Sequence, residues 1–266
     1  MSLAVTILGC GSSGGVPRLG GGWGACDPEN PMNRRRRCSI LVEQSANNDS
    51  GITRVLVDTS PDLRQQLLDL EVDRLDAILL SHSHADHIHG MDDVRPLVIH
   101  NHKRIDLYMD QATSDVVKAG FGYIFETPPG SQYAPMLTEK RLQPGRGAAL
   151  DGPGGVVDVM PFLVHHGEID ALGFRFGNIA YTPDLIDIPP ESIAALEGLD
   201  VWIIDALRHI PHPSHFSLAQ ALEWVARMKP RRAILTNMHN DLDYETLRRQ
   251  LPDGVEPGFD GMRVEA

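Results

Sequence analysis

Residues 76–87 of the chain, DAILLSHSHADH, place a short apolar run directly before three histidines and an aspartate. The run is typical of a buried strand, and the polar residues after it are all potential metal ligands. His82 and His84 are two positions apart, so an extended backbone points both side chains the same way. Asp86 and His87 are neighbours and must diverge, so one segment can serve two adjacent metal positions. Imidazole and carboxylate together favour Zn, Mn or Fe over Ca.

Outward from this segment, the chain alternates short apolar runs with amphipathic stretches. A helix is predicted over 61–70, where Pro lies near the start and leucines recur on one face. Further helices are predicted over 111–118, 217–228 and 244–251. The predicted strands are 4–8, 39–43, 54–57, 76–80, 105–109, 156–164, 173–176, 178–181, 201–205 and 233–236. Strands and helices in this order predict an α/β layered domain without an internal boundary.

One stretch departs from this pattern. Residues 126–155 are rich in Pro and Gly, and we expect a long surface excursion with one short strand inside it. Two interpretations stay open, a tolerated insertion and a flap over a functional site.

Composition and charge exclude several classes of protein. Of the 266 residues, 42% are hydrophobic and 23% charged, which is typical of a soluble globular chain. The formal net charge of −12 argues against non-specific binding of nucleic acid. No apolar run is long enough to span a membrane, and the N-terminus lacks the positive region of a secretory signal. Three cysteines without a CxxC pair do not indicate a disulfide framework, which fits a cytoplasmic protein.

The histidines are distributed unevenly along the chain. All 12 histidines lie at or after His82, in groups within 82–102, 165–166 and 209–215, with His239 alone. Strand-like runs separate these groups. Their spacing therefore predicts that they converge on one site in space.

The segment His82-Ser-His-Ala-Asp-His87 resembles the HxHxDH signature of the metallo-β-lactamase superfamily. The resemblance implies one domain over residues 1–266 with an αβ/βα sandwich fold, in which helices flank two mixed β-sheets. It also implies two divalent metal ions per chain, Zn or Mn, with Fe as a further option. Asp58, which follows the strand 54–57, matches the aspartate that orients the histidine loop of this superfamily from behind the ligands.

The same resemblance assigns the remaining ligands. His166, which precedes a glycine, is preferred over His165, and Asp184 matches the aspartate that bridges both ions. Relatives often carry a histidine directly after the threonine of a late strand, where this chain has Asn237. The role of this metal ligand is therefore assigned to His239, two residues after Asn237. The implied division is His82, His84 and His166 on one ion, Asp86, His87 and His239 on the other, and Asp184 between them.

Within the superfamily, the chain is most similar to the phosphoribosyl 1,2-cyclic phosphate phosphodiesterase branch, over essentially its whole length. Residues 9–17, GCGSSGGVP, and 34–39, RRRRCS, carry this likeness. Relatives often hold a structural zinc with several cysteines; only Cys26 lies in that region here, so no structural zinc is expected. The glycine-rich piece fits GxGxxG, but no helix follows, so a tight loop near the metal site is preferred over a dinucleotide site. The arginine run 34–37 is interpreted as structural ion pairs rather than as ligands of a phosphate.

The implied reaction is hydrolysis of a small ribosyl or nucleotide phosphodiester, cyclic forms included, to a phosphomonoester by a metal-bound hydroxide. Asp184 bridges the ions, and His215, just before the helix 217–228, matches the histidine that protonates the leaving group. No membrane partner is expected, because the chain has no apolar run long enough to span a membrane. The resemblance includes a homodimer among the expected assemblies.

Other functions stay open. A tRNA 3′-end endonuclease needs a basic arm, which neither the acidic chain nor the lysine-poor stretch 126–155 indicates. A thioester or lactam hydrolase of the same superfamily would use the same ligands. A di-iron redox protein pairs this fold with a flavin domain, for which no length remains. A non-catalytic binding role would not need a complete ligand set.

Overall fold

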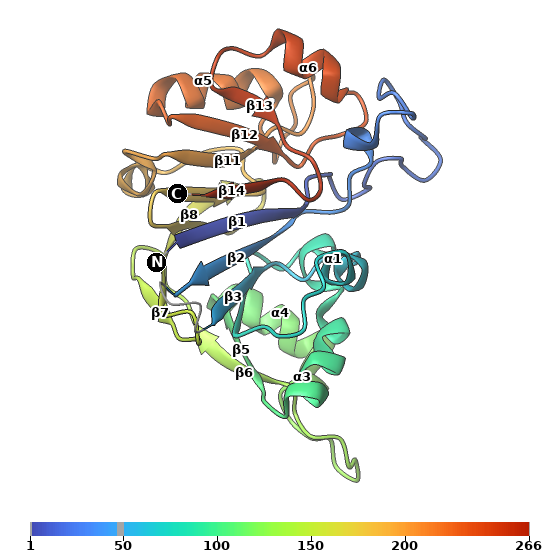
Figure 1. Cartoon of the computed structure of the whole chain (residues 1–266), viewed down its shortest axis with the longest axis vertical. Coiled ribbons are helices and arrows are strands. Elements are labelled where there is room, and N and C mark those ends of the chain that lie inside the picture. Colours follow the sequence, from blue (N-terminus) through green and yellow to red (C-terminus); the bar gives the residue numbers. More distant parts are fainter. Residues whose placement is uncertain (1, 47–50, 266) are drawn as a thin grey trace.

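Two seven-stranded β-sheets form the centre of the molecule (Figure 1). The computed structural model describes residues 2–46 and 51–265. The first sheet consists of β1 (Ser2–Gly9), β2 (Ser39–Ser45), β3 (Ile52–Val57), β4 (Ala77–Leu79), β5 (Ile105–Met109), β6 (Leu137–Arg141) and β14 (Arg263–Glu265). The second consists of β7 (Ala148–Leu150), β8 (Val157–His166), β9 (Ile169–Phe176), β10 (Ile179–Thr182), β11 (Val201–Asp205), β12 (Arg232–Thr236) and β13 (Val255–Pro257).

Both sheets are mixed. The first has the order β14-β1-β2-β3-β4-β5-β6, with antiparallel pairs from β14 to β3 and parallel pairs from β3 to β6. The second has the order β13-β12-β11-β10-β9-β8-β7, parallel from β13 to β10 and antiparallel from β10 to β7. The predicted α/β class, with two mixed sheets in a sandwich, is confirmed.

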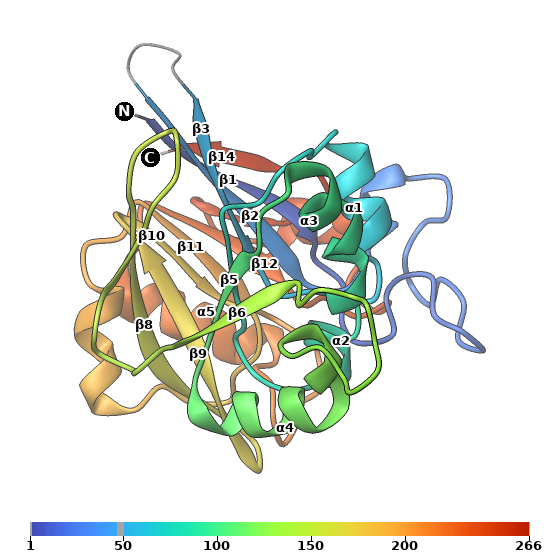
Figure 2. The same cartoon turned by 90° about the horizontal axis from the view of Figure 1, so that it is seen from below.

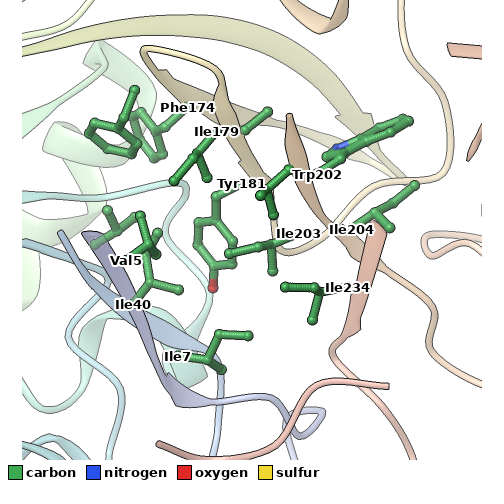
Figure 3. Packing of buried hydrophobic residues seen from close by; sticks show 14 of the residues in the cluster. Val5, Ile7, Ile40, Phe174, Ile179, Tyr181, Trp202, Ile203, Ile204 and Ile234 are labelled. Carbon is green, nitrogen blue, oxygen red and sulfur yellow. The ribbon is translucent and has the colours of Figure 1, made fainter. Parts of the chain in front are cut away.

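Alternate residues of the first sheet serve two different cores, because successive side chains of a strand point to opposite faces. In β2, Ile40 and Val42 point into the layer between the sheets, whereas Leu41 packs on the outer side. Figure 3 shows the inner layer, where Ile40 lies opposite Tyr181 and Ile203 of the second sheet.

Helices cover the outer face of each sheet (Figures 1 and 2). Over the first sheet lie α1 (Leu63–Asp69), α2 (Ala85–Ile88), α3 (Arg95–Asn101) and α4 (Gln111–Phe121). Over the second lie α5 (Leu218–Met228) and α6 (Tyr244–Gln250). Short 3₁₀ turns occupy Pro31–Asn33, Met91–Val94, Gly122–Ile124 and Pro190–Leu196. No helix in the described ranges is long and apolar enough to cross a membrane.

The stretch 126–155 differs from its prediction. It contains two strands, β6 and β7, and each forms the edge of one sheet, so the segment carries the chain from the first sheet to the second. None of its residues lines the cleft at the metal centre described below. The structure therefore gives this stretch a structural role as a crossover rather than the position of a flap.

Candidate metal centre

The predicted ligands lie on loops at the carboxyl ends of strands from both sheets. The segment 82–87 follows β4, His166 ends β8, and Asp184 follows β10. His84 is the N-cap of α2, so the backbone changes from extended to helical between His84 and Asp86. This change separates the pair His82 and His84 from the pair Asp86 and His87, as the spacing predicts.

Four side chains form one group. The ligand atoms of His82, His84, His166 and Asp184 all lie within 4.8 Å of one another. His82 Nε2 is buried and has no hydrogen-bond partner among the described residues. His166 Nδ1 donates to Ser214 O across 2.6 Å, which leaves a lone pair on His166 Nε2, only 3.1 Å from His84 Nδ1. A cation between these nitrogens would satisfy them together, so this donor set fits a divalent metal ion.

A second, smaller group shares Asp184. The ligand atoms of Asp86, His87 and Asp184 also lie within 4.8 Å of one another. His87 Nε2 is 3.5 Å from Asp86 Oδ2 and 3.4 Å from Asp184 Oδ2. This nitrogen is buried without a hydrogen bond to any described residue. Two carboxylates beside one imidazole fit a second divalent ion, with one ligand fewer than the first group has.

Asp58 supports the histidine loop from behind. Its Oδ2 accepts a hydrogen bond from His87 Nδ1 at 2.8 Å, and both of its oxygens accept from Ser81, each at 2.8 Å. Ser81 Oγ in turn lies 2.9 Å from His82 Nδ1. A carboxylate on the far nitrogen of a ligand histidine fixes the ring's tautomer and orientation. The structure thus places Asp58 where the predicted supporting role requires it.

The two adjacent histidines at the end of β8 have different surroundings. His165 is half-buried, and its Nδ1 lies 2.7 Å from Asp170 Oδ1. His166 is buried and belongs to the first ligand group. Adjacent strand residues point to opposite faces, so only one of the pair can face the metal centre, and here it is His166.

The structure does not bring His239 into either ligand group. Asn237 instead lies beside the centre and donates from Nδ2 to Asp184 Oδ1 across 3.2 Å. Asn237 has a φ of 59°, so the chain turns sharply directly after β12. This turn directs His239 to the rim, where its Nδ1 lies 3.8 Å from Asp241 Oδ1. The transfer of the ligand role to His239 finds no support in this geometry.

His215 lies at the edge of the metal centre, with its ring centroid 4.6 Å from that of His166. Its Nδ1 lies 3.0 Å from Oδ2 of Asp205, the buried residue that ends β11. Burial alone would lower the pKa of His215, but Asp205 and Asp184 outweigh it and raise this pKa to about 9. Asp205 is not among the site residues predicted from the sequence, although it carries the same signal as Asp58, an acidic residue at the end of an apolar run.

A cleft of about 420 Å³ opens onto both ligand groups. Its floor contains four of the predicted ligands, His84, Asp86, His166 and Asp184. Its wall is basic and hydroxylic, a combination suited to an anion. Ser12, Ser13, Arg18, Arg208 and His239 are among the residues of this wall.

The arginine run 34–37 lies outside this cleft, and two of its four members form the expected ion pairs. Arg36 and Arg37 form ion pairs with acidic residues at the two ends of α1, and the buried Arg35 donates to main-chain carbonyls. In the described part of the chain, no cysteine belongs to either ligand group. The expectation that Cys26 holds no structural zinc stays a prediction.

Comparison with known proteins agrees with this geometry. Residues 53–238 match the family described as the beta-lactamase superfamily domain. An octanoyltransferase of Porphyromonas gingivalis (strain ATCC BAA-308 / W83) is 33% identical over 263 residues, which are 97% of this chain and 50% of that protein. The chain therefore spans about half the length of this curated relative.

Several solved structures of other proteins are similar to this chain over almost all of its length. A diphosphatase from the PhnP family is 36% identical with a TM-score of 0.88, over 100% of this chain and 98% of that one. Zn²⁺-bound PqqB from Methylobacterium extorquens is 17% identical with a TM-score of 0.75, over 99% and 100% of the two chains. Human tRNase Z, short form, is 16% identical with a TM-score of 0.65, over 98% of each chain. The last two share the fold alone.

Proposed function

Because the chain belongs to the β-lactamase superfamily and, within it, to the PhnP family, we propose that it is a phosphodiesterase that hydrolyses a small ribosyl or nucleotide phosphodiester to a phosphomonoester. Family and ligand groups together identify a metal-dependent hydrolase. The observation that carries the finer proposal is His215, which lines the same cleft as both ligand groups and whose Nδ1 lies 3.0 Å from the buried Asp205 Oδ2.

Each of the two ligand groups would hold one metal ion. His82, His84 and His166 would hold one ion, Asp86 and His87 the other, and Asp184 would lie between them. Divalent ions held this way act as Lewis acids, which activate water as a nucleophile and offset negative charge on phosphoryl oxygens. We propose Zn or Mn, with Fe as the further option.

His215 supplies the proton that a departing alkoxide needs. The His215 Nδ1–H donates to Asp205, so Nε2 is the ring nitrogen left for a substrate. The raised pKa keeps this ring protonated near neutral pH, where it can act as a general acid. Asp205 fixes the ring's orientation and stabilises its positive charge, as a carboxylate does behind other catalytic imidazoles.

The direct test is turnover of bis(p-nitrophenyl) phosphate by metal-depleted protein and by protein refilled with Zn or Mn. We expect release of p-nitrophenol only after refilling and its loss in His84→Ala, which removes one ligand of the larger group. His165→Ala is the matched control, because it removes a neighbouring histidine that faces away from the centre. Two bound ions without any release would contradict the proposal.

The same protein preparation separates the other candidates. Hydrolysis of a thioester or a lactam in place of the phosphodiester would favour those branches of the superfamily, and cleavage of a tRNA precursor would favour an RNA-processing enzyme. The activity named for the octanoyltransferase belongs to a protein twice as long as this chain. A homodimer and the lack of non-specific nucleic-acid binding stay predictions.

A further inference from the structure

The loop between β11 and α5 carries a histidine that the proposed reaction does not use. His212 lies on this loop and lines the cleft beside His215. Proline precedes and follows His212 in the sequence. Each proline fixes its own φ, and the second also restricts the backbone of His212, the residue before it. The loop therefore presents His212 to the cleft in a narrow range of backbone conformations.

Ser214 fixes which nitrogen of the His212 ring carries the proton. The Ser214 main-chain N–H donates to His212 Nδ1 at 3.3 Å, and Ser214 Oγ lies 3.1 Å from the same nitrogen. A main-chain N–H can only donate, so Nδ1 is the acceptor and the neutral ring carries its proton on Nε2. The carbonyl oxygen of Ser214 accepts from the metal ligand His166, so one residue orients both rings.

The His212 ring is neutral near neutral pH, and its Nε2–H has no acceptor within the protein. The pKa of His212 is lowered by burial first and then by three neighbouring positive groups, His215, Arg208 and His239. Among the described residues, no group accepts a hydrogen bond from Nε2. His212 therefore offers the cleft one uncharged N–H donor, in a ring whose other nitrogen is already bonded.

The neighbours of His212 decide which part of a substrate this donor meets. Its ring centroid lies 5.1 Å from that of His215, the residue that would protonate the leaving group. His212 belongs to neither ligand group. The donor therefore lies beside the leaving group rather than beside the phosphoryl oxygens that the ions would bind.

We propose that His212 determines specificity for the leaving group, because its Nε2–H donates to an oxygen next to the one that His215 protonates. This role rests on the proposed function and narrows it to leaving groups with a hydroxyl or ether oxygen on the adjacent carbon, as in a ribose. Such an oxygen has lone pairs for the N–H, whereas an alkyl leaving group would cover the donor without accepting from it. A site with a donor of this kind discriminates against the analogue that lacks the oxygen.

Two esters of AMP test this role, because they differ only in the leaving group. The 2-hydroxyethyl ester releases ethylene glycol, the ethyl ester releases ethanol, and both leave AMP. The metal-loaded wild-type protein should have the higher kcat/KM for the 2-hydroxyethyl ester. His212→Ala should lower the ratio of the two kcat/KM values by about 2- to 12-fold, the range of one hydrogen bond between uncharged groups. Intrinsic differences between the esters cancel when this ratio is compared between proteins.

Two further variants and a third substrate separate the contact from the fold of the loop. His212→Gln keeps an N–H donor and an oxygen that can accept from Ser214, so it should restore most of the wild-type ratio. His209→Ala is the matched control, because it removes an exposed histidine of the same loop that does not line the cleft. All four proteins should hydrolyse bis(p-nitrophenyl) phosphate at the same rate, since p-nitrophenolate has no oxygen adjacent to the scissile one.

Each outcome decides one question. A wild-type ratio in His212→Ala, or an equal fall on both AMP esters, would overturn the role of His212. If His212→Ala also slows bis(p-nitrophenyl) phosphate, the loop and the Ser214 contact to His166 have shifted, and the ratio in His212→Gln decides instead. Hydrolysis of bis(p-nitrophenyl) phosphate but of neither AMP ester would overturn the role while the phosphodiesterase stands. If the metal-loaded protein hydrolyses none of the three compounds, the proposed function itself fails.

Discussion

Asn237 donates one side-chain amide group to two carboxylates, Asp184 Oδ1 and Asp205 Oδ1, each across 3.2 Å. An amide N–H has no lone pair, so in this arrangement it cannot bind a cation. Asn237 therefore connects Asp184, the carboxylate shared by both ligand groups, to the pair of His215 and Asp205, and its amide nitrogen does not add a metal ligand. The two metal positions are unequal as a result, with four side chains around one and three around the other.

Unequal positions predict unequal affinities for metal. We expect the protein to bind a first ion tightly and a second one more weakly, because the second group has one ligand fewer. Asn237→His should raise the affinity for the second ion by at least the roughly 10- to 100-fold that supporting partners of a ligand contribute. Calorimetric titration of metal-depleted protein with Zn measures both steps. His239→Asn is the control, and a loss of the second step in that variant would restore His239 as a ligand.

His215 should matter most for substrates with poor leaving groups. Replacement by Ala removes the general acid, so kcat on an alkyl phosphodiester should fall by about 10²- to 10⁴-fold. A p-nitrophenolate leaves without protonation, so the loss on bis(p-nitrophenyl) phosphate should be much smaller. Comparing the two substrates in wild-type protein and His215→Ala measures this difference. Equal losses on both would contradict the role, and Asp205→Asn should follow the pattern of His215→Ala more weakly.

Asp58→Asn should lower the affinity for metal, although Asp58 is not itself a metal ligand. The amide cannot accept hydrogen bonds from both His87 and Ser81 in the way that the carboxylate does. We expect metal affinity to fall by about 10- to 100-fold, as for other partners of ligand histidines. Equilibrium dialysis with Zn measures the change. Asp110→Asn is the control because it changes an acidic N-cap of α4 far along the chain and keeps a good capping residue. Equal affinity in Asp58→Asn and wild type would rule the role out.

The lowered pKa of Asp243 predicts that the folded protein loses stability in acid. Burial alone would raise the pKa of this N-cap of α6, but hydrogen bonds from Thr246, Asn33 and Asp27 outweigh it and lower the pKa from 3.8 to about 2. The folded state therefore holds the proton less strongly than the unfolded state. The stabilisation is fully present above about pH 4 and is lost as the pH falls towards 2.

Two substitutions separate the capping from the charge. Asp243→Ala should lower the free energy of unfolding by about 1 kcal/mol at pH 7, the usual loss for an N-cap. Asp243→Asn keeps a capping oxygen but does not ionise, so its stability should depend less on pH between 4 and 2 than that of wild type. Urea unfolding at pH 7, 4 and 3 measures both. The same acid dependence in all three proteins would assign the loss to other groups.

The long apolar runs could be predicted from the sequence because their pattern is local. Strands 105–109 and 201–205 match β5 and β11 to the residue, and helix 217–228 begins at its N-cap Ser217, which forms a capping box with Gln220. The elements that the sequence does not predict are short or weakly patterned. β13 and β14 have three residues each, too few for a period, and α3 has no fully buried residue.

The site could be predicted in part, for a related reason. The segment 82–87 carries its ligands in one local pattern, and the geometry brings them together. The roles of Asn237 and Asp205 depend on which strands lie side by side, since β11 pairs with both β10 and β12. That pairing joins parts of the chain far apart in sequence, and no local pattern contains it. The positive φ of Asn237, which turns His239 away, is likewise a property of the folded loop.

The pairing of β14 with β1 has a consequence for how the protein is made. Residues 4–6 of the first strand bond to residues 263–265 of the last, side by side in Figure 1. During synthesis, β1 leaves the ribosome early, and one of its edges has no partner until almost the entire chain has followed. An unpaired strand edge can recruit other chains, so a nascent or shortened chain is exposed to aggregation over most of its synthesis.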